Sequence, residues 1–406
     1  MRTWNYQNNE LHVDNISLKR IADKQDTPFY LYSLKSLTQC YQDFERAAKE
    51  HLKFPFTICY ALKANPHLKI VKQLAKLGSG ADIVSGGELS RALDCGILPE
   101  NIVFSGVGKK KNEIDHAIKS SIGSLNVESL EELELINQIA KENRTKANVA
   151  LRLNPDVKAK THHHISTGTS THKFGIVEKD MIESFSNENL WTDVNLVGIS
   201  VHIGSQLKNL DATKEAIVQL SNVANKCPYK LKFLDVGGGL GIDYHQEEDS
   251  DYSTPTTYIQ TVQSALDEAL KVSIDKIIFE PGRCIVAKCG LLINSVIRRK
   301  ESEGNHFLIV DGGMNDFVRS SLYDAYHELL PENKFPKRQK MAYNVVGPIC
   351  ESADSFAKNR LLPEMKCDEL IAVADTGAYG KSMASHYNLR QPALEIVIGL
   401  DGQVTD

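Results

Sequence analysis

Short apolar runs alternate with longer amphipathic stretches through the middle of the chain. Eight runs are rich in β-branched residues: Thr57–Leu62, Ala81–Ser85, Ile102–Ser105, Leu125–Val127, Val149–Leu153, Leu196–Ile203, Phe233–Val236 and Ile277–Phe279. The stretches between them have helical spacing, for example Leu130, Leu133 and Ile136. This alternation indicates a parallel sheet, and eight repeats predict a closed (β/α)8 TIM-like barrel. A doubly wound sheet is the alternative, but no G-x-G-x-x-G fingerprint follows the first run.

The pattern changes near residue 284, where strand-like runs follow one another without long helices between them. These runs are Leu291–Ile297, Phe307–Val310, Tyr343–Val346, Leu370–Ala374 and Leu394–Ile398. They predict a mainly antiparallel β-domain, and the early run Phe29–Tyr32 is assigned to it as well. We therefore expect an α/β barrel over residues 34–283 and a β-domain formed by residues 1–33 with 284–406.

Composition and charge narrow the classes of protein. The 406 residues are 42% hydrophobic and 24% charged, with a net charge of −5. No broad basic stripe is present, which argues against a nucleic-acid or membrane-surface partner. The run Lys109–Lys111 is short, and we expect it to be a solvated helix start. No apolar run reaches the ~18 residues that a membrane span needs.

The cysteines suggest neither a metal site nor a disulfide framework. Eight are present, and none forms a C-x-x-C pair. This usage fits a reducing cytoplasm. The loop expected over residues 154–174 contains His162, His163 and His164. A metal site there is conceivable, but adjacent loop histidines usually face solvent.

Reactive groups in barrels of this kind cluster where strands end, so the residue after each run is informative. Lys63 follows the first run directly. A poorly hydrated barrel mouth disfavours an ammonium ion and makes a neutral, nucleophilic amine available. The alternative is a lysine that extends from the barrel rim into solvent.

Glycines and a carboxylate follow the last two barrel runs. Gly237, Gly238 and Gly239 could converge their backbone N–H groups on a phosphate, or form a flexible turn. Glu280 begins the segment Glu280-Pro281-Gly282-Arg283. A carboxylate at this depth needs a cationic partner, which a protonated pyridine nitrogen would supply. A structural Glu280–Arg283 pair is the alternative.

Three further polar residues follow other strands. His202 could stack on a planar ring or be a core histidine, and the hydroxyl of Ser205 could bind phosphate. Asp82 could orient another polar group or cap the following helix. A nucleophilic amine, a carboxylate for a ring nitrogen, a stacking imidazole and a phosphate nest are together what pyridoxal phosphate requires.

Nine segments carry a resemblance to known enzymes. Tyr60–Asn65, Asp82–Leu89, His202–Gln206, Gly237–Gly239 and Glu280–Arg283 resemble the alanine-racemase-like barrel class of pyridoxal-phosphate enzymes. Asp311–Arg319, Leu322–Tyr326, Gly347–Ser352 and Thr376–Gly380 resemble the diaminopimelate decarboxylases within that class. The resemblance runs from about residue 28 to residue 390 and implies decarboxylation of meso-2,6-diaminopimelate to L-lysine and carbon dioxide.

The resemblance also implies roles for particular residues. Lys63 would form the Schiff base with the cofactor, Glu280 would pair with its ring nitrogen, and His202 would stack on its ring. The other cofactor-binding residues would be Asp82, Ser205, Gly237, Gly238, Gly239, Pro281, Gly282, Arg283 and Tyr379. The substrate-binding residues would be Arg283, Arg319, Tyr323, Glu351 and Tyr379. Cys350 would donate a proton after carbon dioxide leaves. In relatives, Cys350 and Glu351 come from the partner subunit, which implies a homodimer with shared active sites.

Other functions remain as alternatives. A sister decarboxylase of ornithine, arginine, lysine or carboxynorspermidine would share the barrel motifs. Ornithine, however, has no distal carboxylate for Arg319. A racemase would present an arginine to the ring nitrogen where this chain has Glu280. A non-catalytic binding paralogue would be expected to lack Lys63 or Cys350, and both are present.

Overall fold

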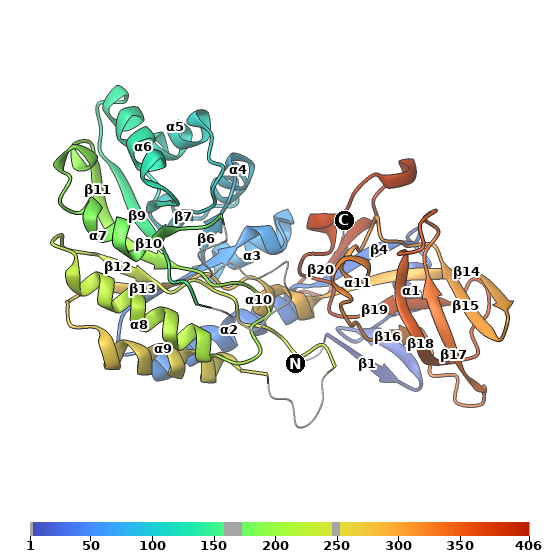
Figure 1. The fold of residues 1–406 in the computed structure, drawn as a ribbon. Helices are drawn as coiled ribbons and strands as arrows, with labels where there is room; N and C mark the ends of the chain where they lie inside the picture. The colour runs from blue at the N-terminus through green and yellow to red at the C-terminus, as the bar shows by residue number, and fades with distance from the viewer. Residues whose placement is uncertain (1–2, 158–172, 246–251, 406) are drawn as a thin grey trace. The chain divides into compact units, whose positions relative to one another are not determined.

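The computed structural model describes residues 3–157, 173–245 and 252–405 (Figure 1). The chain forms two compact units. One contains residues 41–242 and 249–284, and the other contains residues 1–40, 243–248 and 285–406. Each unit is described in turn.

Eight parallel strands of the first unit close into a barrel, which confirms the predicted fold class. They are β5 (Phe56–Ala61), β6 (Gly80–Ile83), β7 (Ile102–Phe104), β8 (Ser124–Val127), β9 (Ala147–Asn154), β11 (Val194–Val201), β12 (Phe233–Asp235) and β13 (Lys276–Phe279). Pairing of β13 with β5 and of β8 with β9 completes the ring. The short strand β10 (Ile176–Val177) pairs with β9.

Helices surround these strands, as the amphipathic stretches predicted. They are α2 (Leu34–His51), α3 (Leu68–Lys76), α4 (Gly86–Asp94), α5 (Lys111–Lys119), α6 (Leu130–Glu142), α7 (Glu178–Ser184), α8 (Asp211–Lys226) and α9 (Pro255–Ala269). Helix α6 illustrates the pattern, since Leu133, Ile136 and Ile139 are buried. Its start is capped by Ser129, whose side chain accepts a hydrogen bond from the backbone of Glu132.

The second unit is a curled mixed sheet. Its strands are β4 (Phe29–Ser33), β14 (Gly290–Ser302), β15 (Asn305–Val310), β16 (Leu329–Pro331), β17 (Lys340–Val346), β18 (Ser355–Pro363), β19 (Leu370–Val373), β20 (Leu394–Ile398) and β21 (Val404–Thr405). The order is β18-β17-β15-β14-β4-β20-β21, and β19 pairs with β14 and β16. Most pairs are antiparallel, but β15–β17 and β4–β20 are parallel. Both parallel pairs join segments separated by long connections, which parallel pairing requires.

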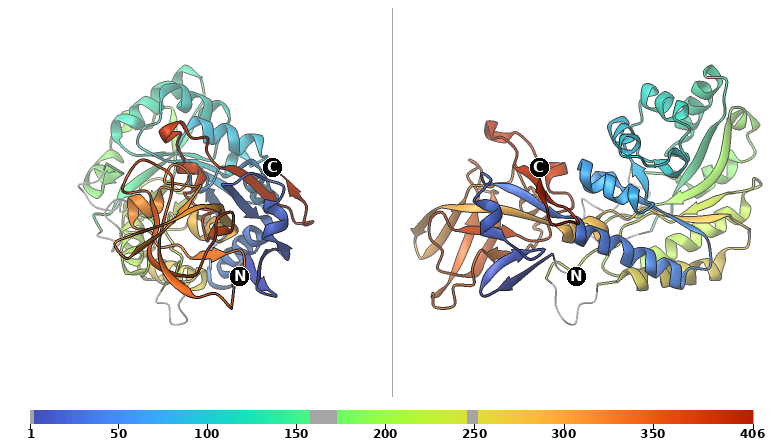
Figure 2. Two further views of the ribbon diagram at one scale, coloured as in Figure 1. Left: turned by 90° about the vertical axis from the view of Figure 1, so that its right-hand side faces the viewer. Right: turned by 180° about the vertical axis from the view of Figure 1, so that it is seen from behind.

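The second unit also contains a small sheet and several short helices. Strands β1 (Trp4–Gln7), β2 (Glu10–Val13) and β3 (Ile16–Ser17) form the small sheet, and α1 (Leu18–Ala22) and α11 (Arg319–Tyr323) are short helices. A further short helix, α10 (Arg283–Val286), contains the last two residues of the first unit and the first two of this segment of the second. Trp4, Leu11 and Val13 pack in one core with Leu31 of β4 and Leu291 of β14. Figure 2 shows these blue N-terminal strands beside the orange and red C-terminal strands.

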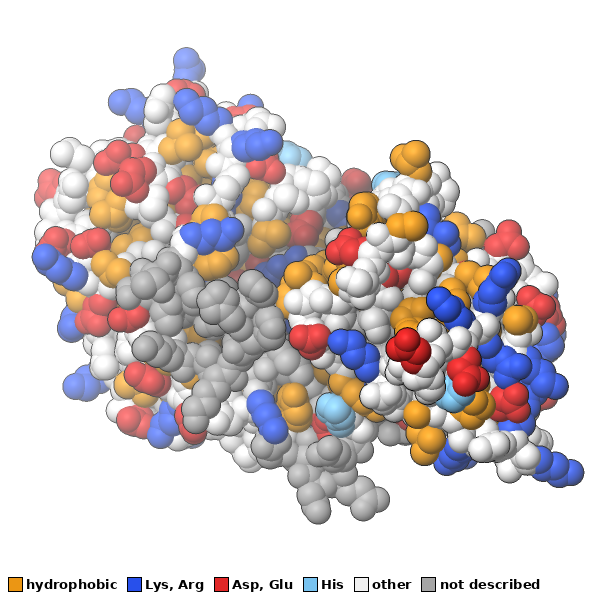
Figure 3. Space-filling model, turned by 45° about the vertical axis from the view of Figure 1, so that its right-hand side comes forward, with side chains coloured by type: hydrophobic (Ala, Val, Ile, Leu, Met, Phe, Trp, Pro, Cys, Tyr) orange, Lys and Arg blue, Asp and Glu red, His pale blue; other side chains and the backbone are white. Residues whose placement is uncertain are grey.

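Acidic and basic side chains are interspersed on the face of the molecule drawn in Figure 3. Among residues 3–157, 173–245 and 252–405, no helix has the length and apolar character that crossing a bilayer demands.

Candidate active site

Lys63 lies where strand β5 ends, in a short 3-10 turn, Leu62–Ala64. Its neighbours Leu62 and Ala64 are buried, whereas the Lys63 side chain lines a cavity of about 350 Å³. Its Nζ lies 2.5 Å from Oδ2 of Asp82 in β6. Ser85, and not Asp82, caps helix α4. Of the two roles considered for Asp82, the structure therefore supports orientation of another polar group, namely the Lys63 amine.

A second acidic group lies at the ends of β12 and β13. Glu280 and Asp235 are both buried, and burial together with the neighbouring carboxylates raises the pKa of Glu280 well above its ordinary value. Burial raises the pKa of Asp235 from 3.8 to about 6. Asp235 accepts hydrogen bonds from Gly237 N at 2.9 Å and from Asn126 Nδ2 at 3.3 Å. Two buried carboxylates repel each other when both are ionised, so this pair favours the binding of a cation beside it.

His202 follows strand β11 and lines the same cavity as Lys63 and Glu280. Its Nδ1 accepts a hydrogen bond from the backbone N–H of Gly238 at 3.2 Å, so the neutral ring carries its proton on Nε2. Burial, with the positive charges of Arg152 and Lys63, lowers the pKa of His202 well below 6.5. The imidazole is therefore neutral at physiological pH, and its orientation is fixed.

The three glycines after β12 are tightly enclosed. A Cβ atom at Gly237 would meet the carbonyl oxygen of Val201, and one at Gly238 would meet that of Glu280. Gly237 also has a φ of +70°. The N–H groups of Gly237 and Gly238 donate to Asp235 and His202. These two glycines therefore hold the acid and the imidazole in place.

The strand end at β13 is held against the segment that carries Lys63. The backbone N–H of Ala61 donates to the carbonyl of Pro281 at 3.1 Å. A Cβ at Gly282 would lie 3.1 Å from those of Ala61 and Ala64. Arg283 Nη2 donates to the hydroxyl of Ser205 at 3.2 Å, which brings together two of the predicted cofactor-binding residues.

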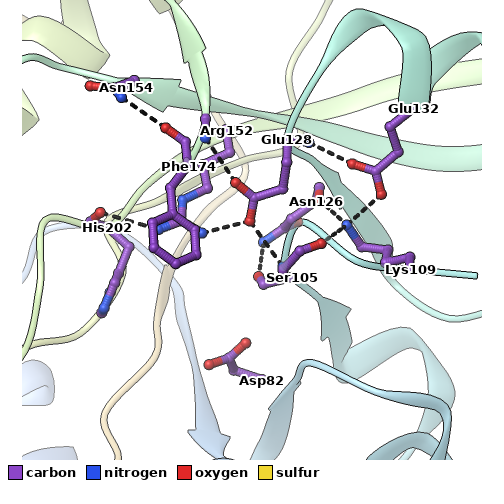
Figure 4. Close-up of polar contacts among 12 residues, drawn as sticks. Asp82, Ser105, Lys109, Asn126, Glu128, Glu132, Arg152, Asn154, Phe174 and His202 are labelled. Atoms are coloured by element: carbon purple, nitrogen blue, oxygen red, sulfur yellow. Dashed lines mark hydrogen bonds and ion pairs between the residues drawn. The ribbon is translucent and has the colours of Figure 1, made fainter. Parts of the chain in front are cut away.

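The sequence analysis did not predict a buried network of charged residues that includes Arg152, which lines the cavity (Figure 4). Arg152 in β9 pairs with Glu128 at 2.6 Å, and its Nη2 donates to the carbonyl of His202 at 3.3 Å. Lys109 pairs with Glu132 at 2.6 Å and donates to the carbonyl of Asn126 at 2.7 Å. The prediction of a solvated helix start is wrong for Lys109, whose side chain is fully buried among these acceptors.

The same network positions Phe174, which also lines the cavity. Asn154 Nδ2 donates to the carbonyl of Phe174 at 2.8 Å, and Gly175 N donates to Glu128 at 2.9 Å. The Phe174 ring centre lies 4.8 Å from the guanidinium carbon of Arg152. One buried ion pair, Arg152–Glu128, thus contacts the two segments that supply His202 and Phe174.

The remaining predicted residues lie in the second unit. Arg319 and Tyr323 are the first and last residues of α11. Cys350 and Glu351 are exposed in the turn between β17 and β18. Asp354 holds this turn, because its carboxylate accepts hydrogen bonds from the backbone of Ile349 and of Met314, both at 2.7 Å.

Tyr379 adopts a left-handed backbone conformation, with a φ of +55°. His162, His163 and His164 lie outside the described residues. Over the described part of the chain, no cluster of three or more His, Cys, Asp or Glu side chains could hold a metal ion.

Comparison with known proteins identifies relatives over nearly the whole chain. The family described as "Pyridoxal-dependent decarboxylase, pyridoxal binding domain" matches residues 37–287. The diaminopimelate decarboxylase of Aquifex aeolicus is 41% identical, with 97% of this chain and 91% of that protein covered.

Solved structures extend the comparison to the fold. The diaminopimelate decarboxylase of Helicobacter pylori, in complex with L-lysine, is 42% identical with a TM-score of 0.88, and 95% of each chain is covered. That of M. jannaschii, also in complex with L-lysine, is 34% identical with a TM-score of 0.90, covering 99% of this chain and 94% of that one. The chain therefore belongs to the pyridoxal-dependent decarboxylase family, in the group formed by the diaminopimelate decarboxylases.

Proposed function

We propose that this chain decarboxylates meso-2,6-diaminopimelate to L-lysine and carbon dioxide with pyridoxal phosphate. The observation that carries the proposal is the position of Lys63, which faces a buried carboxylate group in the cavity of a barrel matched by the family's pyridoxal-binding domain. Relatives with this activity in their names match nearly the full length of the chain.

The residues of the barrel fit the cofactor. Asp82, Asp235 and Glu280 form a buried acidic group, and Oδ1 of Asp82 has no hydrogen-bond partner among the described residues. Burial and the neighbouring carboxylates raise the pKa of Glu280, and a positively charged ring nitrogen beside it would stabilise its ionised form. Bound pyridoxal phosphate supplies an electron-withdrawing ring that stabilises the negative charge left when the substrate's carboxylate departs.

Different barrel residues would bind different parts of the cofactor. Lys63 would bind it through its amine, and Asp82 would keep that amine in position. Glu280 would face the ring nitrogen, and the neutral imidazole of His202 would stack on the ring. The candidates for the phosphate are Ser205 and Gly239, and the other cofactor-binding residues would be Pro281, Gly282, Arg283 and Tyr379. Gly237 and Gly238 would act by holding Asp235 and His202.

The β-domain would bind the rest of the substrate. Diaminopimelate carries an ammonium and a carboxylate at each end, so its distal end needs both an acid and guanidinium groups. Glu351 would bind the distal ammonium, and Arg283, Arg319 and Tyr323 would bind the distal carboxylate. The thiol of Cys350 would donate the proton that replaces the lost carboxylate.

Cys350 and Glu351 are exposed in a single chain. We propose that they complete the site of a partner subunit, so that the enzyme is a homodimer with shared active sites. The cytoplasmic location and the absence of nucleic-acid or membrane partners stay predictions.

The test is release of carbon dioxide by the purified, cofactor-loaded protein. Meso-diaminopimelate, ornithine, arginine and lysine are compared in parallel under identical conditions. We expect release from diaminopimelate, with rates for the other three at least about 10²-fold lower because they leave the distal site incompletely paired. Release from ornithine alone would assign the chain to the sister enzymes.

A further inference from the structure

A second cavity lies at the other end of the barrel from Lys63. Its volume is about 190 Å³, and we call it the basal cavity. Strand β13 shows the separation of the two cavities, since Lys276 is its first residue and Glu280 follows its last. Lys276 lines the basal cavity, and Glu280 lines the cavity that contains Lys63. Four residues of extended chain span about 13 Å, so the two cavities are distinct.

The alternation of side chains along β13 directs Lys276 into the barrel. Residues two apart on a strand lie on the same face of the sheet. Ile278 belongs to the buried core of the barrel, and Lys276 therefore faces the barrel axis with it. Its Nζ donates to the hydroxyl of Thr57 on the neighbouring strand at 3.1 Å. The ammonium group thus lies at the end of the barrel core.

The inner wall of the basal cavity is apolar. Five residues that line it belong to one buried cluster, namely Cys59, Val103, Val197, Phe233 and Ile278. Burial raises the pKa of the Cys59 thiol well above its ordinary value, so this group is neutral as well. Layers of side chains normally fill the interior of such a barrel. The space left here can therefore accommodate the apolar part of a ligand.

The charged groups of the basal cavity are unequal in number. Lys232 and Lys276 line it at the starts of β12 and β13, and Glu100 lines it just before β7. Within residues 3–157, 173–245 and 252–405, neither lysine forms an ion pair with a carboxylate. Strand β7 is four positions from β12 around the ring, so Glu100 lies across the barrel from Lys232. Two ammonium groups on one side favour an anionic ligand group there.

The volume of the basal cavity limits the size of this ligand. A cavity of about 150 Å³ accommodates benzene, whereas pockets for drug-sized molecules begin at about 300 Å³. A space of about 190 Å³ therefore holds one six-membered ring, or a short branched chain, with one small head group.

We infer that the basal cavity binds a small monocarboxylate with an apolar aromatic or branched aliphatic body. The apolar body would pack against Val103, Val197 and Ile278. The carboxylate would accept hydrogen bonds from Lys276 and Lys232. The inference does not depend on the proposed function, because no residue that lines the basal cavity is among those proposed to bind cofactor or substrate.

Methyl NMR of the protein loaded with pyridoxal phosphate tests the inference, because Ile278 lines the basal cavity and reports on binding there. With isotope-labelled isoleucine, benzoate should shift the Ile278 methyl resonance with a Kd at or below about 1 mM. Benzyl alcohol has the same ring without the charge and should bind at least about 10-fold more weakly. Naphthalene-2-carboxylate, whose two rings exceed the available volume, should leave the Ile278 resonance unshifted.

Three variants separate the roles of the lysines. Lys276→Met removes the ammonium group but keeps an unbranched side chain, and it should weaken benzoate binding at least about 10-fold. Lys232→Met, at an exposed lysine, should weaken it about 3-fold. Lys271→Met is the matched control and should bind benzoate as the wild type does, because Lys271 is exposed between α9 and β13 and does not line the basal cavity. All three should keep the absorption band of the bound cofactor.

The ligand series on the wild-type protein decides the matter even if a variant fails to fold. An Ile278 resonance that does not shift with benzoate up to about 10 mM would overturn the inference. Equal affinities for benzoate and benzyl alcohol would overturn it too, since the lysines would then not recognise the ligand. So would undiminished benzoate affinity in Lys276→Met, or binding of naphthalene-2-carboxylate as tight as that of benzoate.

Discussion

Lys63, Asp82 and Glu280 show how a few buried charges can define a reactive site. One amine faces Asp82 directly, while Glu280 and Asp235 hold protons more tightly than isolated acids do. Removing any member changes the charge balance of a poorly hydrated cavity, where charge interactions are strong. Substitution of Lys63 therefore tests cofactor binding, and substitution of Glu280 tests how the stability of the barrel depends on pH.

Lys63→Ala should abolish the visible absorption band that pyridoxal phosphate gives when bound, and should lower kcat by at least about 10³-fold. The reason is loss of the only amine proposed to hold the cofactor. Lys276→Ala is the matched control, because this barrel lysine donates to Thr57 and does not line the cavity that contains Lys63. An undiminished band in Lys63→Ala would exclude Lys63 from its proposed role.

Glu280→Gln should change how the stability of the cofactor-free protein depends on pH. Since the folded-state pKa values of Glu280 and Asp235 are raised, the folded protein binds more protons than the unfolded chain. Their contribution to stability is fully present below pH 3.8 and is lost as pH rises through about 6 and beyond. Gln removes the repulsion between them.

Thermal unfolding measures this effect. Between pH 5 and pH 8, Tm of the cofactor-free wild type should fall by about 2–4 °C more than Tm of Glu280→Gln. Glu364→Gln, which alters an exposed ion pair, should follow wild type. Parallel curves for wild type and Glu280→Gln would contradict the assignment of raised pKa values to this pair.

At the scale of the elements, the sequence predicted which residues follow the barrel strands, but it did not predict which side chains of different strands pair with each other. Lys63, His202 and Glu280 each follow an apolar run, and the barrel topology then places them around one cavity. Arg152 was overlooked although an arginine inside the apolar run Val149–Leu153 is itself a signal of a buried charge. Its partner, Glu128, follows another strand, and no spacing in the sequence joins the two.

The apolar pattern of the sequence also predicted strands of the β-domain, but fewer of them than in the barrel. Its most apolar strands were found, but β18 was missed because Lys358, Asn359 and Arg360 interrupt the apolar pattern. The parallel pairing of β4 with β20 depends on the return of the chain over a long distance, which local periodicity does not encode.

Arg152→Met should destabilise the barrel by about 3–5 kcal/mol, because it leaves the buried Glu128 carboxylate without its guanidinium. Chemical denaturation of the cofactor-free protein measures the loss. Adding Glu128→Gln should recover part of it, since the double variant leaves no buried charge of this pair unpaired. Arg299→Met, at an exposed pair, should cost no more than about 1 kcal/mol. A small effect of Arg152→Met would show that the ion pair is not important for the barrel.

The proposed homodimer with shared sites belongs to the scale of the whole molecule. Lys63→Ala and Cys350→Ala homodimers should each be nearly inactive. Mixed dimers, formed by refolding the two together, should regain about a quarter of wild-type activity, because half of the dimers form and each has one intact site. No recovery on mixing, with dimers present by sedimentation, would place Lys63 and Cys350 of one site in the same chain.

The position of β4 between β14 and β20 has a consequence for synthesis in the cell. All five of its residues are buried in the finished sheet, yet both neighbouring strands are translated hundreds of residues later. When this segment leaves the ribosome, its backbone hydrogen-bonding groups and its side chains are therefore still unpaired and exposed, which favours association with other chains. The barrel can form before the C-terminal strands have been synthesised, and residues 29–33 remain unpaired during that time. We therefore expect chaperones that bind early in translation to bind at residues 29–33.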